Sequence, residues 1–278
     1  GLLAPTSSVI PLVHQPIAES RMYLPLAIVV TLAVLGVFAL LGRRPLALTL
    51  AMGFAFTATT ARRNLDYRSQ VGLWTATLAH VPDNARAHSN LAAKLLETER
   101  VAESLDHAAT AVRLRPAYPE ARINLGLALA ASGRVAEAVA HLKTAVELMP
   151  NDPAAHANLG NVLVRAGAPA EAVSHLETAL RLDPNSLRVH NDLGVVLLDL
   201  GRPADALTHD QAAVRLDPNF PDAHYNLGNA LVALGRPAEA IAAYETALRL
   251  RPNFAKAENN LGATLLNLVR PAEALPHF

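Results

Sequence analysis

Residues 153–186 read PAAHANLGNVLVRAGAPAEAVSHLETALRLDPNS, and this stretch decides the fold. From Ala154 to Arg165 it carries apolar residues at helical spacing, and Gly167 then interrupts the pattern. A second amphipathic stretch runs to Pro184, where it ends because proline cannot continue a helix. The stretch therefore predicts two short helices joined by a tight turn.

The same pattern recurs along most of the chain. Asn-Leu-Gly or a near variant returns every 34 residues from Asn90 to Asn260, and proline keeps the same step from Pro82 to Pro252. A constant step without insertions predicts identical helical hairpins stacked in an α-solenoid. We expect five whole repeats and a truncated sixth, at residues 85–118, 119–152, 153–186, 187–220, 221–254 and 255–278.

The repeat resembles a known family. Its best copy comprises His224, Leu227, Gly228, Leu231, Ala240, Tyr244 and Pro252. Their spacing is similar to that of the tetratricopeptide repeat, W-x2-L-G-x2-Y followed by A-x3-F and P. The resemblance implies an all-α fold and a right-handed solenoid of about 5.5 repeats. The family's aromatic residue at the fourth position is replaced here by His, Arg or Glu, which predicts a shallower core.

Small residues set how closely the helices approach. Glycine at the eighth position of a repeat and alanine at the twentieth and twenty-seventh let helix backbones approach closely, and leucine at the seventh fills the space between them. At the twenty-fourth position other repeats have Leu142, Leu176, Tyr244 and Phe278, but the fourth repeat has Asp210 there. We therefore expect the fourth repeat to be locally the least stable.

A capping helix is expected before the first repeat, at residues 64–84. Trp74 and Pro82 fit the phase of a second helix of the repeat. An unpaired second helix at this place would cap the solenoid and join it with little slack to whatever precedes it.

Two long apolar segments precede the repeats. Residues 22–42 contain no ionisable side chain other than that of Tyr23, and residues 46–61 form a second uncharged run. At ~1.5 Å per residue the first run crosses a hydrocarbon core of ~30 Å. We expect a transmembrane hairpin within residues 22–63, with a cleavable signal peptide as the competing interpretation. The arginines lie on both sides of the spans and do not fix their orientation.

The segments beside these spans also resemble a family. They read SVIPL at residues 8–12, ESRMYLP at residues 19–25 and DNA at residues 83–85. This arrangement is similar to the end of the membrane part of transmembrane and tetratricopeptide-repeat glycosyltransferases, which are O-mannosyltransferase-like proteins of the GT-C class. The resemblance implies that residues 1–21 are the rest of an extracytoplasmic loop and that the repeats are periplasmic or luminal. A cytoplasmic repeat domain is the alternative.

That family places its catalytic acids in an early loop, which would lie upstream of this sequence. No residue here is therefore expected to be catalytic, and a polyprenyl-phosphate-sugar donor would be used only by a full-length parent. Whether the parent is an enzyme stays open. We expect the sequence to be part of a longer protein.

Composition excludes several kinds of site. The chain has 24 Lys and Arg against 24 Asp and Glu, so bulk charge gives no reason to expect nucleic-acid binding. It has no cysteine, hence no disulfide or thiolate site. Its histidines mostly fall in two columns at the repeat step, and stacked equivalents stand ~8–10 Å apart, too far to share one zinc ion. We expect neither a metal nor a cofactor.

A column of polar residues marks the candidate binding site. The sixth position of the successive repeats holds Asn90, Asn124, Asn158, Asp192, Asn226 and Asn260. In tetratricopeptide superhelices this position faces the concave groove, and the column resembles the asparagine ladder of protein O-GlcNAc transferases. Carboxamides can pair with the peptide groups of an extended chain without reading its sequence. The alternative is that each asparagine bonds to a neighbouring repeat and serves only the fold.

Further polar groups accompany the column, namely Asn161, Asn191, Asn229, Asn259 and Tyr225. Asp192 is an acceptor-only group and favours a ligand amine or guanidinium. The basic residues Arg86, Arg188 and Lys256 are too scattered to form the clamp that binds a free carboxylate terminus.

These observations lead to two hypotheses of different classes. The first is a membrane-anchored scaffold that binds an extended peptide or partner protein in its groove and recruits substrates to a membrane glycosyltransferase. The second is an anchored adaptor without enzymatic activity, which assembles other proteins.

Overall fold

The computed structural model describes residues 69–277. These residues form thirteen α-helices and a final 3-10 helix, with no strand among them. The two spans expected at residues 22–42 and 46–61, and the loop expected at residues 1–21, lie outside the described residues. Within the described part no helix has the length and apolar character needed to cross a membrane. The described part is an all-α tetratricopeptide-type solenoid.

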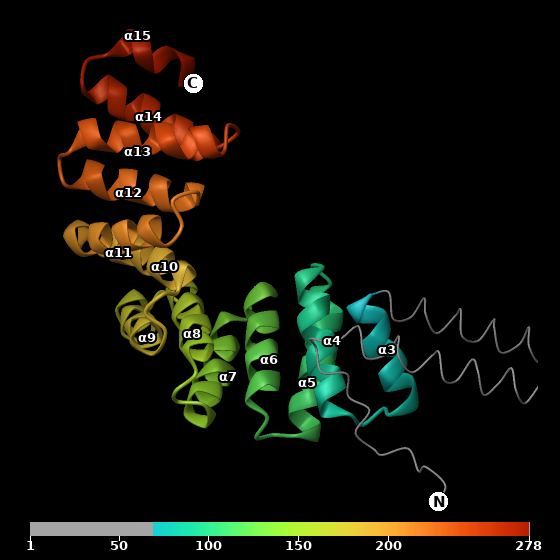
Figure 1. Cartoon of the computed structure of the whole chain (residues 1–278). Helices are drawn as coiled ribbons and strands as arrows, with labels where there is room; N and C mark the ends of the chain where they lie inside the picture. The colour runs from blue at the N-terminus through green and yellow to red at the C-terminus, as the bar shows by residue number, and fades with distance from the viewer. Residues whose placement is uncertain (1–68, 278) are drawn as a thin grey trace, which may run out of the picture. The chain divides into compact units, whose positions relative to one another are not determined.

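Helices come in antiparallel pairs after a single leading helix, as Figure 1 shows from α3 to α15. The leading helix α3 spans Gln70–His80. The hairpins that follow are α4 (Ala85–Glu97) with α5 (Val101–Leu114), α6 (Pro119–Ala131) with α7 (Val135–Leu148), α8 (Pro153–Arg165) with α9 (Pro169–Leu182), α10 (Leu187–Asp199) with α11 (Pro203–Leu216), α12 (Pro221–Ala233) with α13 (Pro237–Leu250), and α14 (Ala255–Asn267) with α15 (Pro271–Ala274), which the 3-10 helix Leu275–His277 continues. The first helices begin 34 residues apart, as the sequence predicts.

Local residue chemistry sets the helix ends. Proline stands at the first turn of α8, where its missing N–H has no intrahelical partner to lose. Asp152 precedes that helix and its carboxylate accepts a hydrogen bond from the N–H of Ala155 at 2.8 Å. Asn84 caps α4 in the same way through the N–H of Ala87, at 3.1 Å.

The turn inside each hairpin needs a left-handed residue. Gly167 supplies it with φ 75°, and the other three inner hairpins also have glycine. The first and last hairpins carry Glu99 and Val269 instead, with φ 60° and 59°. A side chain in this conformation costs about 1–2 kcal/mol, so the two outer turns are strained where the inner ones are not.

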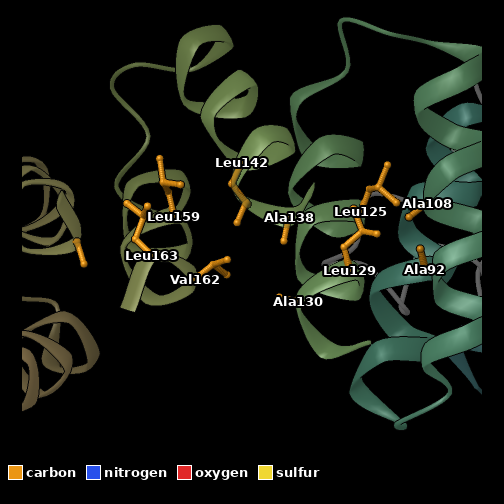
Figure 2. Packing of buried hydrophobic residues seen from close by; sticks show 11 residues of the cluster. Ala92, Ala108, Leu125, Leu129, Ala130, Ala138, Leu142, Leu159, Val162 and Leu163 are labelled. Carbon is orange, nitrogen blue, oxygen red and sulfur yellow. The ribbon is translucent and has the colours of Figure 1, made fainter. Parts of the chain in front are cut away.

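Within a hairpin a glycine lies under a large side chain. A Cβ atom on Gly160 would lie 2.8 Å from Cγ of Leu176, so only glycine allows this approach. The first hairpin has the opposite combination, in which Ala92 and the small Ala108 are both fully buried. Figure 2 shows the row of aliphatic side chains that continues from these alanines through Leu125 to Leu163, across successive hairpins. The core is a thin layer made of separate buried clusters, and partly buried residues such as Val164 and Leu207 pack against two neighbouring clusters each.

The first helices of the hairpins form one shared surface. Helix α4 contacts α6, and the same holds for α6 with α8, α8 with α10, α10 with α12, and α12 with α14. Each second helix packs mainly between its own first helix and the first helix of the next hairpin. The first helices are therefore the more closely spaced row, and we call their common surface the first-helix face.

Helix α3 covers the N-terminal end of this stack. Its Trp74 is 8% exposed and packs in one cluster with Ala87, Leu91 and Leu95 of α4. The helix expected over residues 64–84 is observed over Gln70–His80, and residues 64–68 lie outside the described part.

Ion pairs on the second helices follow the repeat. Directly before α5 the guanidinium of Arg100 pairs with Glu103 of that helix at 2.6 Å, and the corresponding pairs are Arg134 with Glu137, Arg202 with Asp205, Arg236 with Glu239, and Arg270 with Glu273. The α8–α9 hairpin has Ala168 in place of the arginine. Its Glu171 pairs instead with Lys143 of the preceding hairpin, at 2.7 Å. These pairs are exposed and contribute little energy each.

Candidate functional site

The expected polar column lies on the first-helix face, one residue on each of α4, α6, α8, α10, α12 and α14. Three of its amides point back to the preceding first helix. Asn124 Nδ2 donates to the carbonyl and hydroxyl oxygens of Ser89, both at 2.9 Å, and Asn226 Nδ2 donates to Oδ1 of Asn191 at 2.8 Å. The partner in both cases stands 35 residues earlier. Such bonds tie consecutive repeats together.

Two other members of the column, Asp192 and Asn260, bond to residues 31 positions earlier. Asn260 Nδ2 donates to Oδ1 of Asn229 at 2.8 Å and to the hydroxyl of Tyr225 at 3.3 Å. Asp192 accepts a hydrogen bond from Asn161 Nδ2 at 2.8 Å. Four of the accompanying polar residues, namely Asn161, Asn191, Asn229 and Tyr225, are therefore partners of the column, and their bonds form separate links between consecutive repeats.

Three of the expected residues make none of these bonds. Asn158 has no hydrogen-bond partner among the described residues, because the residue 35 positions earlier is Ile123. Asn90 would look back to residue 55, which is not described. Asn259 is exposed on α14. Asn158, whose hairpin lies between two described hairpins, can therefore meet a ligand without giving up a bond to the described part of the chain.

A cavity of 580 Å³ opens on the first-helix face between α10, α12 and α14. It is lined by Asn191, Gly194, Val195, Leu198, Asp199, Asp210, Phe220, Asp222, Tyr225, Asn226, Asn229, Phe254 and Lys256. Its volume lies in the range of small-ligand and side-chain sites. Four of the expected site residues border the cavity. The sequence therefore predicted polar residues in this region but did not predict a cavity there.

Asp210 is the unusual group of this cavity. Its side chain is 1% exposed and lies against Gly194, and neither carboxyl oxygen has a hydrogen-bond partner. Burial raises the pKa of Asp210 to about 8. In the next hairpin Tyr244 takes this place and its hydroxyl donates to Oδ1 of Asn229 at 2.8 Å. The residue equivalent to Asn229 in the α10–α11 hairpin is Val195, whose side chain cannot form a hydrogen bond to Asp210.

The two histidine columns meet in pairs. Nδ1 of His88 lies 2.8 Å from Nδ1 of His107, and the pairs His156–His175 and His190–His209 repeat this contact at 3.0 and 3.1 Å. In the first pair Nε2 of His88 contacts the carbonyl of Pro82, so that nitrogen carries the proton and Nδ1 accepts from His107. No group of three metal-binding side chains occurs within residues 69–277. The two histidines of a pair are 19 residues apart in sequence. Comparing only histidines at the 34-residue step therefore does not reveal the pairs.

Acid is expected to loosen the hairpins that contain these pairs. Burial and then the partner imidazole lower the pKa of His107 and of His175. The folded state thus holds these protons less firmly than the unfolded state, so the contribution to stability is present above pH ~6.5 and is lost as the pH falls below it. We expect amide exchange in α4–α5 and α8–α9 to accelerate between pH 7.5 and 5.5, after correction for intrinsic exchange.

The chain supplies its own control for this prediction. In α12–α13 the residue 19 positions after His224 is Ala243, so the histidine pair is missing there. Protection in α12–α13 should therefore change less over the same pH range. An equal change in all three hairpins would show that the paired histidines are not the cause.

Family comparison agrees with this architecture. Profiles described as "Tetratricopeptide repeat" match residues 57–119, 157–221 and 221–254, and one described as "TPR repeat" matches residues 126–167. No curated protein matches the chain by sequence.

Solved structures share the fold. MamA 41-end from Desulfovibrio magneticus RS-1 is 27% identical with a TM-score of 0.55, over 58% of this chain and 90% of that one. YrrB, described as a TPR protein with an unusual peptide-binding site, is 22% identical with a TM-score of 0.54, over 66% and 95%. The Cut9–Hcn1 hetero-tetramer of APC/C matches at 21% identity with a TM-score of 0.65, over 74% of this chain and 40% of that one. With its repeated hairpins and matching profiles, the chain belongs to the tetratricopeptide repeat family.

Proposed function

We propose that the repeats form a scaffold that holds an extended peptide segment of a partner protein along the first-helix face. The observation that carries this proposal is the 580 Å³ cavity between α10, α12 and α14, which combines amide groups with aromatic side chains. Amides can bond to peptide groups of any sequence, and aromatic rings supply apolar contact area. The peptide-binding site described for YrrB supports the same interpretation by analogy of fold.

Asn158 gives the sharpest test of this groove. Its change to alanine removes an amide without breaking a described inter-repeat bond, so we expect peptide affinity to fall about fivefold, with little change in stability. Asn124→Ala should weaken binding and also loosen α6 from α4, because it loses both bonds to Ser89. Calorimetric titration with a peptide selected from a random library by the full chain measures affinity, and circular dichroism measures stability.

The matched control is Asn151→Ala, in the exposed turn before α8. It should leave both quantities unchanged. If Asn158→Ala binds the selected peptide as tightly as the unmodified chain does, the peptide does not use this part of the column.

We further propose that residues 22–63 anchor the scaffold in a membrane, with the repeats on the extracytoplasmic side, and that it recruits protein substrates to a membrane glycosyltransferase. The resemblance of residues 8–85 to transmembrane and tetratricopeptide-repeat glycosyltransferases supports this proposal. Proteolysis of sealed vesicles tests the orientation, since repeats inside the vesicle are protected. Sequencing of the gene upstream of Gly1 tests the parent, which should encode further spans with acidic residues in the first extracytoplasmic loop.

An anchored adaptor without a transferase is the second candidate. It predicts the same groove binding but no sugar transfer. Changing Asn124, Asn158 and Asn226 together to alanine should reduce glycan transfer if the scaffold serves a transferase, and only complex formation if it serves assembly.

A further inference from the structure

The cavity on the first-helix face is lined by one buried carboxyl group that has no hydrogen-bond partner in the described part of the chain. Most polar groups around it are paired, for example Asn191 with Asn226 at 2.8 Å. Asp210 borders the cavity with both carboxyl oxygens unpartnered, although its side chain is 1% exposed. A buried carboxyl group without partners costs free energy in the empty protein. A ligand that supplies two donors in one plane would remove that cost.

The other walls of the cavity suit a flat cation. Phe220, Tyr225 and Phe254 line it, and the rings of Tyr225 and Phe254 lie 5.0 Å apart between centroids. Aromatic faces attract guanidinium groups and stack on them. The acidic side chains there are Asp199, Asp210 and Asp222, set against the single basic lining residue Lys256.

The protein already holds one guanidinium in this manner. Arg251 forms two bonds to Asp222, at 2.6 Å and 3.1 Å, and its guanidinium lies 4.6 Å from the centroid of the Phe254 ring. This pair satisfies Asp222 from within the chain. Asp210 is the counterpart for which the described part of the chain provides no arginine.

We propose that the cavity is a specificity pocket for an arginine side chain of the bound peptide, with Asp210 as the carboxylate that receives the guanidinium. Such binding requires the Asp210 side chain to turn from Gly194 towards the cavity, so that its two oxygens receive two parallel N–H groups of the ligand, a bidentate geometry that lysine cannot provide. The inference rests on the proposed peptide-binding role and adds the chemistry of one ligand residue to it.

Arginine binding should be linked to proton release. Because burial raises the pKa of Asp210 to about 8, the empty pocket is mostly protonated at pH 7, and the arriving cation displaces that proton to solvent. Affinity should therefore rise between pH 6 and 8, by up to about tenfold per pH unit. The other ionisable groups around Asp210 are Asp199 on α10, Asp222 with its partner Arg251, Lys256 on α14, and the neighbouring His209 with its partner His190.

The test uses the full chain and two small probes, Nα-acetyl-arginine methylamide and the citrulline analogue, which has nearly the same shape but no charge. Binding is followed by the amide NMR shifts of α10, α12 and α14. We expect the arginine probe to bind at least about tenfold more tightly than the citrulline probe, and Asp210→Asn to remove that difference and the pH dependence. Lys256→Ala should tighten arginine binding, because it removes a like charge.

Folding and charge are controlled separately. Asp210→Leu copies the residue found at Leu142 and Leu176, so it is expected to fold and to lose arginine binding. Glu177→Gln removes one exposed negative charge from α9 and should leave the affinity unchanged. Equal binding of the two probes, or unchanged arginine binding by Asp210→Leu, overturns the proposal.

A random peptide library displayed to the same proteins separates this proposal from the broader one. Selected peptides should carry arginine at one fixed place, and only when Asp210 is present. Peptides selected without such an arginine would overturn the pocket and leave groove binding intact. Binding of the arginine probe without any selected peptide would leave arginine recognition by the cavity intact but overturn peptide binding along the groove. Failure of both the probe and the library would overturn both proposals.

Discussion

Asp210→Leu is expected to stabilise the α10–α11 hairpin by about 2–4 kcal/mol at pH 4 and by more at higher pH, since it replaces an unsatisfied buried carboxyl group by an apolar side chain. Leu142 and Leu176 fill the equivalent place over Gly126 and Gly160, so the site has the shape for leucine. Repeat arrays do not unfold in one step, so the effect should be measured as amide exchange protection in each hairpin.

The size of this gain should depend on pH. The raised pKa of Asp210 means that the folded state binds its proton more tightly than the unfolded state does. Below pH ~4 both states are protonated and the carboxyl group costs least; stability then falls as the pH rises towards 8, by up to about 1.4 kcal/mol per unit. The advantage of Asp210→Leu should therefore shrink at low pH.

Two further variants separate charge from polarity. Asp210→Asn should lose the pH dependence but keep most of the cost of a buried polar group. The reciprocal change, Leu142→Asp, should destabilise α6–α7. If α10–α11 is already as slow to exchange as its neighbours in the unmodified chain, Asp210 is not the weak point that its burial indicates.

Leu176→Ala is expected to destabilise α8–α9 by about 2–5 kcal/mol, because Leu176 is fully buried and its loss leaves a cavity above Gly160. Gly160→Ala alone should cost about 1–3 kcal/mol, since its new Cβ atom would lie 2.8 Å from Cγ of Leu176 and 3.3 Å from the carbonyl oxygen of Ala172. Denaturant titration combined with amide exchange measures both.

The double variant should be more stable than the sum of the single changes predicts. The methyl group added by Gly160→Ala would occupy part of the space left by Leu176, and alanine has the higher helix propensity by about 1 kcal/mol. The first hairpin already contains this combination, since Ala92 and Ala108 are both fully buried there. Simple additivity of the two costs would mean that the backbones, not the side chains, set the helix spacing.

Periodicity predicted the fold well because each hairpin repeats the same local chemistry. A 34-residue step places the column residues on the same helix of every hairpin, but it does not reveal which way an amide points. Asn124 turns back to Ser89 because serine can accept there, whereas the residue 35 positions before Asn158 is Ile123, which has no side-chain acceptor. Reading the residue 35 positions earlier for each asparagine would have separated the two cases.

The histidine pairs and the cavity beside Asp210 could not be predicted from the 34-residue step alone. The histidines form pairs between the two columns, so the constant separation of 19 residues was the available signal. Asp210 was found by comparing one column, because a carboxyl group replaced Leu or Tyr. That it borders a cavity also depends on Val195 and Gly194, which lie on another helix and carry no signal of their own.

The ion pairs of the second helices bear on how this chain could grow or shrink in evolution. In five hairpins the arginine and its acidic partner lie three residues apart, so a 34-residue unit carries its own pair wherever it is copied. Glu171 is different, because its partner Lys143 belongs to the unit before it. Duplication or loss of a unit in register is neutral for these charges at most places, but it separates a pair when it falls between α7 and α8. We therefore expect selection to keep the second and third repeats adjacent.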